Sequence, residues 1–334
     1  MSWVAIAAAF SLSGCTLSPS ATAQTDLQTA TPFEPTLSYE GTPPEWAQTA
    51  TEVMMQLEDW RNLSFNESLQ VTFETQVDPN LNGYYNSETK KLSVAADASE
   101  ALGRGVLLHE IFHALQDQNF DLYQLRIQSA SSDDRDKALS AIIEGEAMLA
   151  VAELMNYNFL AHARLPESGE ISEAFFSNLF LYGSGLQFIE AIRAEGGWAA
   201  VNEVFQDPPQ ATMLILNPER YLAGERTSPK LEIPLAAGEQ LEAEQIRGAY
   251  QVQWLFAQQP ELRSQLPRLA KSYLTDTLAI VSTPDGIAHR WIVELESAAD
   301  AEALTASFIT ALKAETATQT VAVSTEGSKI LASW

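Results

Sequence analysis

The chain has 334 residues, of which 46% are hydrophobic, and this is enough for one large or two medium-sized domains with a buried core. Its formal net charge is −25, from 19 basic and 44 acidic residues, and no stretch is basic enough to follow a phosphate backbone, which argues against nucleic-acid binding. Cys15 is the only cysteine, so an internal disulfide bond is excluded.

The first 42 residues are typical of an exported protein with a spacer. The apolar run Trp3–Phe10 is too short to span a bilayer and ends in Leu12-Ser13-Gly14-Cys15, which resembles the signal of a bacterial lipoprotein. The resemblance implies a signal peptide over residues 1–14 and a lipid on Cys15 that anchors the chain to a membrane of the cell envelope. No Lys or Arg precedes the apolar run, and an ordinary secretory signal is the alternative. Residues 15–42 are rich in Ser, Thr, Ala, Pro and Gln and predict a flexible tether.

Helical and extended patterns follow the tether. Helical spacing of apolar residues predicts a packing helix that opens at Pro43-Pro44. Alternating residues predict a strand over Leu69–Thr75. Gly83–Asn86 and Lys90–Val94 flank a turn and predict a hairpin.

The stretch Ser99–Asn119 predicts one buried helix, because its apolar residues lie nearly all round. His109 and His113 are four residues apart and share one face, where both imidazoles can reach a single metal ion. Glu110, between them, can hold a metal-bound water and accept its proton. The alternative is a pair of core histidines with satisfied hydrogen bonds and a glutamate on the surface.

A metal centre of this kind needs a third protein ligand and one open position. After an expected loop over Asp121–Asp134, Arg135–Phe159 predicts a long helix that carries Glu144-Gly145-Glu146. A carboxylate from this helix is the natural third ligand, because His162 and His289 have no ligand spacing. Position alone does not distinguish Glu144 from Glu146, and Gly145 would let the two helices approach closely.

The pattern His109-Glu110-x-x-His113 with a later Glu144-Gly145-x-Ala147 resembles the gluzincin class of zinc metallopeptidases. The chain is also similar to a largely uncharacterised family of bacterial and archaeal HExxH proteins, although Asn217 stands where that family's pattern has histidine. The motifs that carry this similarity are Gly83-Tyr84-Tyr85, His113-Ala114-Leu115-Gln116-Asp117-Gln118, Tyr182-x-x-Gly185, Gly196-Gly197-Trp198, Pro208-Pro209 and Asn217-Pro218-Glu219-Arg220-Tyr221.

The gluzincin resemblance implies Zn²⁺ held by His109, His113 and Glu144, with Glu110 as the general base of peptide hydrolysis. It also implies a zincin-like domain with a metal helix, a glutamate helix and a small sheet. An edge strand of that sheet, beside the metal helix, would pair with the backbone of a peptide or protein substrate. An ordinary sheet strand is the alternative.

Other metal chemistries fit less well. The metzincin pattern needs glycine and histidine where this chain has Gln116 and Asn119. Two histidines and a carboxylate also suit non-haem iron, but Glu110 has a task in hydrolysis and none in oxygen activation. The rival class is a non-catalytic envelope lipoprotein whose structural metal site supports a binding module. Structural zinc sites usually have four protein ligands, and the three good candidates here favour catalysis.

Two further residues are candidates for supporting roles. Tyr182 could donate a hydrogen bond to the oxyanion of a tetrahedral intermediate, or be a buried aromatic residue with a satisfied hydroxyl. Asp117 could accept a hydrogen bond from His113 and orient it, or be a solvated residue at the helix end.

The remaining sequence completes an α+β fold that is mainly helical. We expect two or three short helices over Ser172–Phe205, with a break at Gly196-Gly197, and an ordered loop over Pro208–Glu225. A boundary near Pro234–Glu239 would separate a zincin-like domain over residues 43–235 from a small α+β unit over residues 236–334. The elements expected in that unit are a helix over Glu242–Gln258, a hairpin of Leu278–Val281 and Ile287–Leu295, a helix over Asp300–Lys313, and strands over Val321–Val323 and Ile330–Trp334.

Overall fold

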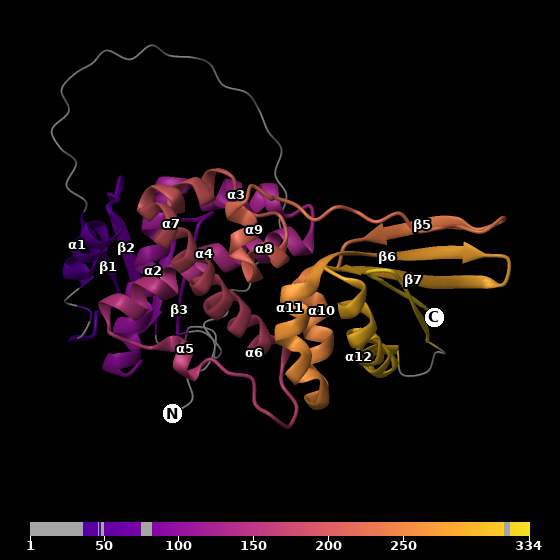
Figure 1. The fold of residues 1–334 in the computed structure, drawn as a ribbon. Helices are drawn as coiled ribbons and strands as arrows, with labels where there is room; N and C mark the ends of the chain where they lie inside the picture. Colours follow the sequence, from indigo (N-terminus) through magenta and orange to yellow (C-terminus); the bar gives the residue numbers. More distant parts are fainter. Residues whose placement is uncertain (1–35, 46, 48–49, 75–81, 317–320) are drawn as a thin grey trace, which may run out of the picture. The chain divides into compact units, whose positions relative to one another are not determined.

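The computed structural model describes residues 36–45, 47, 50–74, 82–316 and 321–334 (Figure 1). The expected signal peptide, Cys15 and residues 15–35 of the expected tether lie outside these residues. Within them the chain is α+β and mainly helical, and no described helix is long and apolar enough to cross a membrane. The chain divides into two compact units, Met1–Asp121 and Leu122–Trp334. The expected domain boundary near residue 235 stays a prediction.

The described part of the first unit combines a small sheet with two helices. Its elements are β1 (Leu37–Glu40), α1 (Ala50–Arg61), β2 (Leu69–Glu74), β3 (Gly83–Asn86), β4 (Lys91–Ala95) and α2 (Glu100–Phe120). The strand order is β1-β2-β4-β3, with β1, β2 and β4 parallel and β3 antiparallel to β4. The predicted strand and hairpin are confirmed. Residues 37–40, expected in the tether, instead form β1, because they pair along β2 from Leu69 to Thr72.

Helix α2 is buried over most of its length, as its apolar pattern predicts. Every residue from Gly105 to Asp117 is buried, and both β3 and β4 pack against the helix. The helix begins after Ser99 and ends where Asp121 adopts a left-handed conformation, with φ 53°. His109, Glu110 and His113 therefore lie on a rigid, water-shielded element.

Helix α4 packs against several other helical elements of the second unit. The helical elements are α3 (Leu122–Ser129), α4 (Asp133–Leu154), α5 (Phe159–His162), α6 (Glu173–Asn178), the π-helix η2 (Leu179–Ser184), α7 (Gly185–Gln206), α8 (Thr212–Leu216) and α9 (Pro218–Leu222). α4 packs against α3, η2, α7 and α8. Its first turn carries Asp133 and Asp136, whose negative charge suits a helix N-terminus, and the buried Asp134.

Two expectations for this helical region are wrong. The expected loop over residues 121–134 contains α3, and the expected loop over 208–225 contains α8 and α9. The helices expected over 172–205 are present as α6, η2 and α7, and they follow one another as a continuous run. That run is broken at Gly196-Gly197 as predicted, where Gly197 has φ 63°. Short helices gain most of their stability from tertiary packing, so local sequence signals them weakly.

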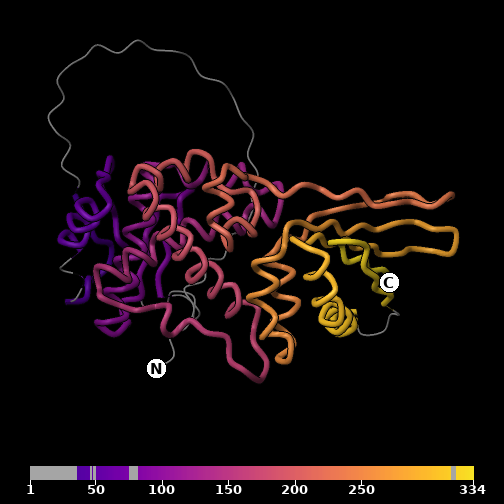
Figure 2. The backbone as a smooth tube through the Cα atoms, in the orientation of Figure 1, coloured from indigo at the N-terminus to yellow at the C-terminus, as the bar shows by residue number. Residues whose placement is uncertain are grey.

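The rest of the second unit is built on an antiparallel sheet. Its elements are β5 (Gln240–Gln245), α10 (Gly248–Ala257), the 3₁₀ helix η3 (Pro260–Gln265), α11 (Leu266–Ser272), β6 (Tyr273–Thr283), β7 (Gly286–Leu295), α12 (Ala298–Thr316), β8 (Ala322–Glu326) and β9 (Lys329–Ser333). The strand order is β5-β6-β7-β9-β8, and β6 and β7 form a long hairpin (Figure 2). Helix α12 packs against β7, β8 and β9.

The predicted hairpin, the α12 helix and the last two strands are confirmed. The helix expected over Glu242–Gln258 is wrong in its first part, because residues 242–245 belong to β5. Pairing with β6 there outweighs the helix propensity of Leu, Glu and Ala.

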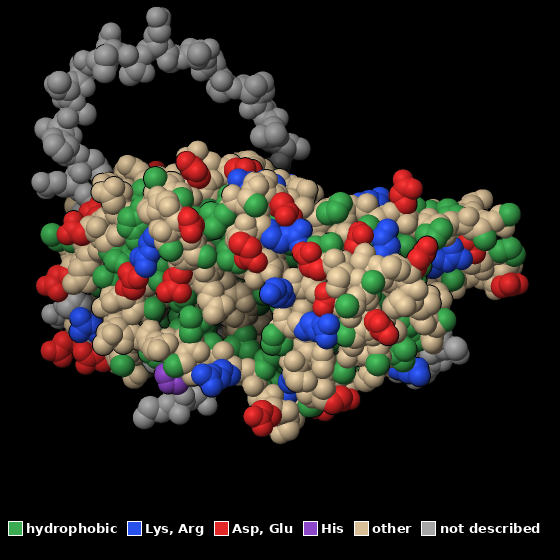
Figure 3. All heavy atoms as spheres, viewed as in Figure 1, with side chains coloured by type: hydrophobic (Ala, Val, Ile, Leu, Met, Phe, Trp, Pro, Cys, Tyr) green, Lys and Arg blue, Asp and Glu red, His purple; other side chains and the backbone are tan. Residues whose placement is uncertain are grey.

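Charged side chains of both signs are interspersed on the face shown in Figure 3. The ion pairs of the second unit include Arg220 with Glu225, Arg268 with Asp300 and Arg290 with Glu239. Among the described residues of that face, basic side chains do not gather into one patch, which agrees with the acidic composition.

Candidate metal centre

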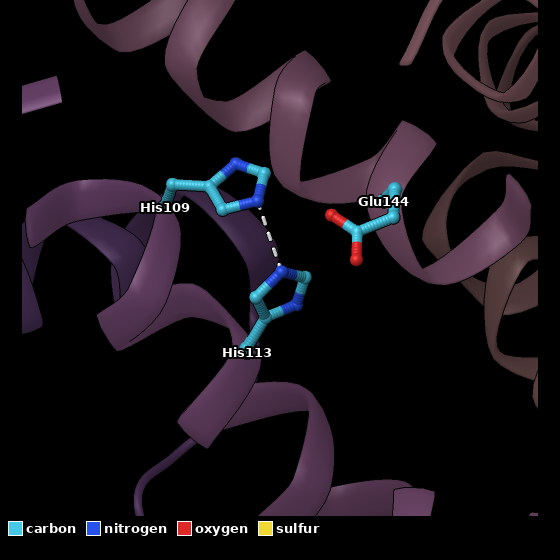
Figure 4. Close-up of side chains that lie close together, drawn as sticks. All are labelled: His109, His113 and Glu144. Atoms are coloured by element: carbon cyan, nitrogen blue, oxygen red, sulfur yellow. Dashed lines mark hydrogen bonds between the residues drawn. The ribbon is translucent and has the colours of Figure 1, made fainter. Parts of the chain in front are cut away.

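His109, His113 and Glu144 come together in the structure (Figure 4). Each offers one ligand atom, and these atoms all lie within 4.8 Å of one another. The histidines project from α2 and the glutamate from α4, and all three side chains are buried. Figure 4 shows the Glu144 carboxylate facing the two imidazole rings.

The spacing of these atoms fits a shared metal ion. His109 Nε2 and His113 Nε2 are 3.0 Å apart. Two ligand atoms at about 2.0–2.1 Å from a tetrahedral ion are separated by about 3.3 Å, so the pair needs little adjustment. The buried His-His-Glu group can therefore bind a metal ion, and it leaves one tetrahedral position for another ligand.

Gln116 orients His113. His113 Nδ1 lies 2.8 Å from Gln116 Oε1, and because an amide oxygen only accepts, Nδ1 donates the hydrogen. A neutral imidazole protonated at Nδ1 has its lone pair on Nε2, which is the atom of His113 that faces His109. Such a partner fixes both the ring orientation and the tautomer of a metal-binding histidine. Sequence reasoning missed Gln116, although its position three residues after His113 on a helix could have indicated it.

The environment of Asp117 matches neither of the two alternatives considered for it. It is buried, with 3% of its surface exposed, which overturns the solvated alternative. Gln116 is the acceptor that orients His113, the role that one of the two alternatives gave to Asp117. Asp117 instead accepts hydrogen bonds from Tyr85 and Lys90 of the β3–β4 hairpin.

The strand β3 passes close to Glu110. Glu110 is buried, and a Cβ atom built on Gly83 would lie 3.4 Å from Glu110 Cγ and 2.5 Å from Val106 Cγ1. Glycine at position 83 therefore lets the strand lie against the helix at the level of Glu110. β3 is also an edge strand of the described sheet, so the predicted edge strand beside the metal helix is confirmed. Its pairing with a substrate stays a prediction.

Gly145 places Glu144 through a contact with α7. A Cβ on Gly145 would lie 2.1 Å from the carbonyl carbon of Gly185, and one on Gly185 would lie 2.0 Å from the oxygen of Ala141. α4 and α7 therefore touch backbone to backbone, so the close approach expected of this glycine is made with α7. Glu146, two residues beyond Glu144, is rotated about 200° around the helix. The structure brings Glu144, and not Glu146, to the histidines.

Arg126 adds a positive charge in the neighbourhood of Glu144. The half-buried guanidinium projects from α3, and its Nη1 donates to Ser140 Oγ at 3.3 Å. Burial lowers the pKa of Arg126, while the carboxylates of Glu144 and Asp136 act in the opposite direction. An arginine stays charged in proteins, so Arg126 is a fixed positive charge that interacts with the Glu144 carboxylate. Sequence reasoning missed this residue, because it lies in the segment expected to be a loop.

The remaining candidates are placed as follows. Tyr182 is buried on η2 and packs edge-to-face on Phe159 at 6.2 Å, and its predicted role in catalysis stays a prediction. His162 stacks on Tyr157 and His289 on Trp334. Neither histidine belongs to the His-His-Glu group found among the described residues, as their spacing predicted.

Comparison of the chain with protein-family models, with curated proteins and with solved structures gives no match. The resemblance to gluzincins therefore depends on the motifs and on the group of His109, His113 and Glu144. Membership of that class stays a prediction, and so does the identity of the metal.

Proposed function

We propose that the chain is a zinc-dependent peptidase. The observation that carries the proposal is the buried group of His109, His113 and Glu144, with Glu110 between the histidines on the same buried helix. Two imidazoles and one carboxylate are the protein ligands of many catalytic zinc sites, whereas structural sites usually have four protein ligands. Iron suits the same ligands but leaves Glu110 without a task.

Each residue of the site has a separate role in the proposed hydrolysis. When bound, Zn²⁺ supplies a Lewis acid and lowers the pKa of a coordinated water to about 7. His109, His113 and Glu144 hold the ion. Glu110 accepts a proton from the attacking water and then passes it to the nitrogen of the leaving amine. Tyr182 is our candidate for a hydrogen-bond donor to the developing oxyanion.

The substrate that this site suits is an extended peptide or an unfolded protein segment. The edge of β3 offers main-chain N–H and C=O groups close to Glu110, and an extended peptide can pair with them. We also propose that a lipid on Cys15 anchors the enzyme to a membrane of the cell envelope, with the tether holding the catalytic part away from the bilayer. Cys15 lies outside the described residues, so this part of the proposal depends on the sequence alone.

The variant Glu110→Gln tests the proposal directly. The amide keeps the shape of the side chain but cannot accept a proton, so digestion of an unstructured peptide library should slow by roughly 10²–10⁴-fold. Zinc content, measured by mass spectrometry, should stay near one per chain, and the melting temperature should not change. Glu100→Gln, at an exposed position in the first turn of the same helix, is the matched control and should behave as wild type. A Glu110→Gln enzyme as active as wild type would end this mechanism.

Metal content tests the third ligand separately. Glu144→Ala should lose zinc as His109→Ala and His113→Ala do, while Glu146→Ala should retain it. The reverse result for the two glutamates would refute the assignment. Wild-type protein that binds zinc, cleaves nothing in a diverse library and unfolds when zinc is chelated would instead indicate the structural-site alternative.

A further inference from the structure

Asp117 ties the β3–β4 hairpin to the metal helix at a single oxygen atom. Its Oδ2 accepts a hydrogen bond from Tyr85 Oη at 2.6 Å and another from Lys90 Nζ at 2.5 Å. Asp117 lies one turn beyond His113 on α2, whereas Tyr85 belongs to β3 and Lys90 to the turn that leads into β4. One carboxylate therefore holds both the edge strand and its turn.

The surroundings of this cluster make its contacts strong. Asp117 is 3% and Tyr85 8% exposed, while the side chain of Lys90 is 47% exposed and brings its charge from the solvent side. The ammonium and the hydroxyl together compensate the carboxylate for its loss of water. Burial and the hydrogen bond to Asp117 raise the pKa of Tyr85 far above its ordinary value, so the hydroxyl remains a donor. Lys90 adopts a left-handed backbone conformation with φ 56°, which is uncommon for a residue with a side chain.

A second contact fixes the other end of the strand. Gly83 and Tyr85 point to the same face of β3, because alternate residues of a strand do so, and both are buried. Gly83 lies against α2 beside Glu110, and Tyr85 reaches Asp117. Glu110 and Asp117 are seven residues apart, or about 10 Å along a helix. The two contacts thus set both the position and the direction of β3 along the metal helix.

We propose that Asp117 is a positioning residue, which holds the edge of β3 in register with Glu110 so that an extended peptide can pair with it. The inference rests on the proposed peptidase function. A strand held in place forms main-chain hydrogen bonds with a peptide without first having to be ordered. Loosening the hairpin weakens substrate binding, while the metal ligands and the proton acceptor on α2 are unchanged.

The variants Tyr85→Phe and Lys90→Met each remove one donor to Asp117 and leave α2 intact. Each should raise KM about tenfold for peptide substrates, with kcat and zinc content within about twofold of wild type. Lys91→Met is the matched control, because Lys91 is the next residue of the hairpin and pairs with Glu74 on β2 instead. It should leave KM unchanged.

Amide hydrogen exchange provides a readout that does not depend on activity. Residues of β3 and β4 should exchange faster in Tyr85→Phe than in Lys91→Met. Faster exchange with unchanged KM would overturn the positioning role, and unchanged exchange would overturn the anchoring itself. Loss of zinc from Tyr85→Phe would also overturn it, because the cluster would then support the metal helix and not the substrate edge. Wild-type protein that binds zinc but neither binds nor cleaves peptides would refute the peptidase function and the substrate role of Asp117 together, while faster exchange would still identify the anchor.

Discussion

The variant Asp134→Asn should flatten the dependence of stability on pH. Asp134 is buried near the start of α4, and its Oδ1 accepts hydrogen bonds from the backbone N of Thr212 at 3.2 Å and from the Thr212 hydroxyl. Gly248, with φ 81°, packs so closely that a Cβ there would lie 1.8 Å from Asp134 Oδ1. Burial raises the pKa of Asp134 to about 7; the hydrogen bonds from Thr212 act against this, and the charge of Asp276 adds to it.

The sign and size of the effect follow from this pKa. In the unfolded chain the ordinary value is 3.8, so between about pH 4 and pH 7 the folded state keeps a proton that the unfolded state has released. The stabilisation is therefore present at the acidic end of that window and is lost as the pH rises through about 7. One pKa unit corresponds to about 1.4 kcal/mol, so the displacement from 3.8 to about 7 corresponds to about 4 kcal/mol. Asparagine does not titrate, so the variant lacks this pH-dependent contribution to the free energy of unfolding.

Urea denaturation at a series of pH values between about 4 and 8 measures the effect. As the pH rises through the series, wild type should lose about 4 kcal/mol of its free energy of unfolding relative to Asp134→Asn. Asp133→Asn removes an exposed carboxylate from the same helical turn and serves as the control, with a curve parallel to that of wild type. Parallel curves for Asp134→Asn and wild type would refute the reasoning.

Three further variants test other parts of the molecule. Gly145→Ala should destabilise the fold by about 3 kcal/mol in thermal denaturation, because its Cβ would lie 2.1 Å from the backbone of α7. Gly183→Ala, whose Cβ would meet no neighbour closer than 3.8 Å, should be tolerated, and equal losses for both would contradict the close packing. Gln116→Met should weaken zinc binding by about 10–100-fold in competition with a chelator, with α2 still folded, because His113 Nδ1 loses its acceptor. Cys15→Ala should abolish labelling by a fatty-acid analogue and release the protein from the membrane fraction; unlabelled, soluble wild type would favour the ordinary secretory signal.

The amino-acid sequence by itself determined the features that depend on local periodicity. Histidines four residues apart share a helix face wherever the helix lies, and the apolar residues around them require burial, so α2 and its pair of imidazoles were predictable. The same holds for the β3–β4 hairpin and for the β6–β7 hairpin, whose alternating residues flank short turns. In each case the residues that determine the local structure lie within about 20 residues of one another in the sequence.

Only the tertiary structure decided between Glu144 and Glu146, because both lie on one helix and the choice depends on which face of α4 turns toward the histidines. The tertiary structure also determined that Gly145 contacts α7 and that Asp117 accepts hydrogen bonds from the β3–β4 hairpin. It likewise determined that residues with helix propensity form strand β5. These outcomes depend on contacts between segments far apart in the sequence. Their free energy comes from backbone approach, strand pairing and the pairing of buried charges, and none of these leaves a period in the local sequence.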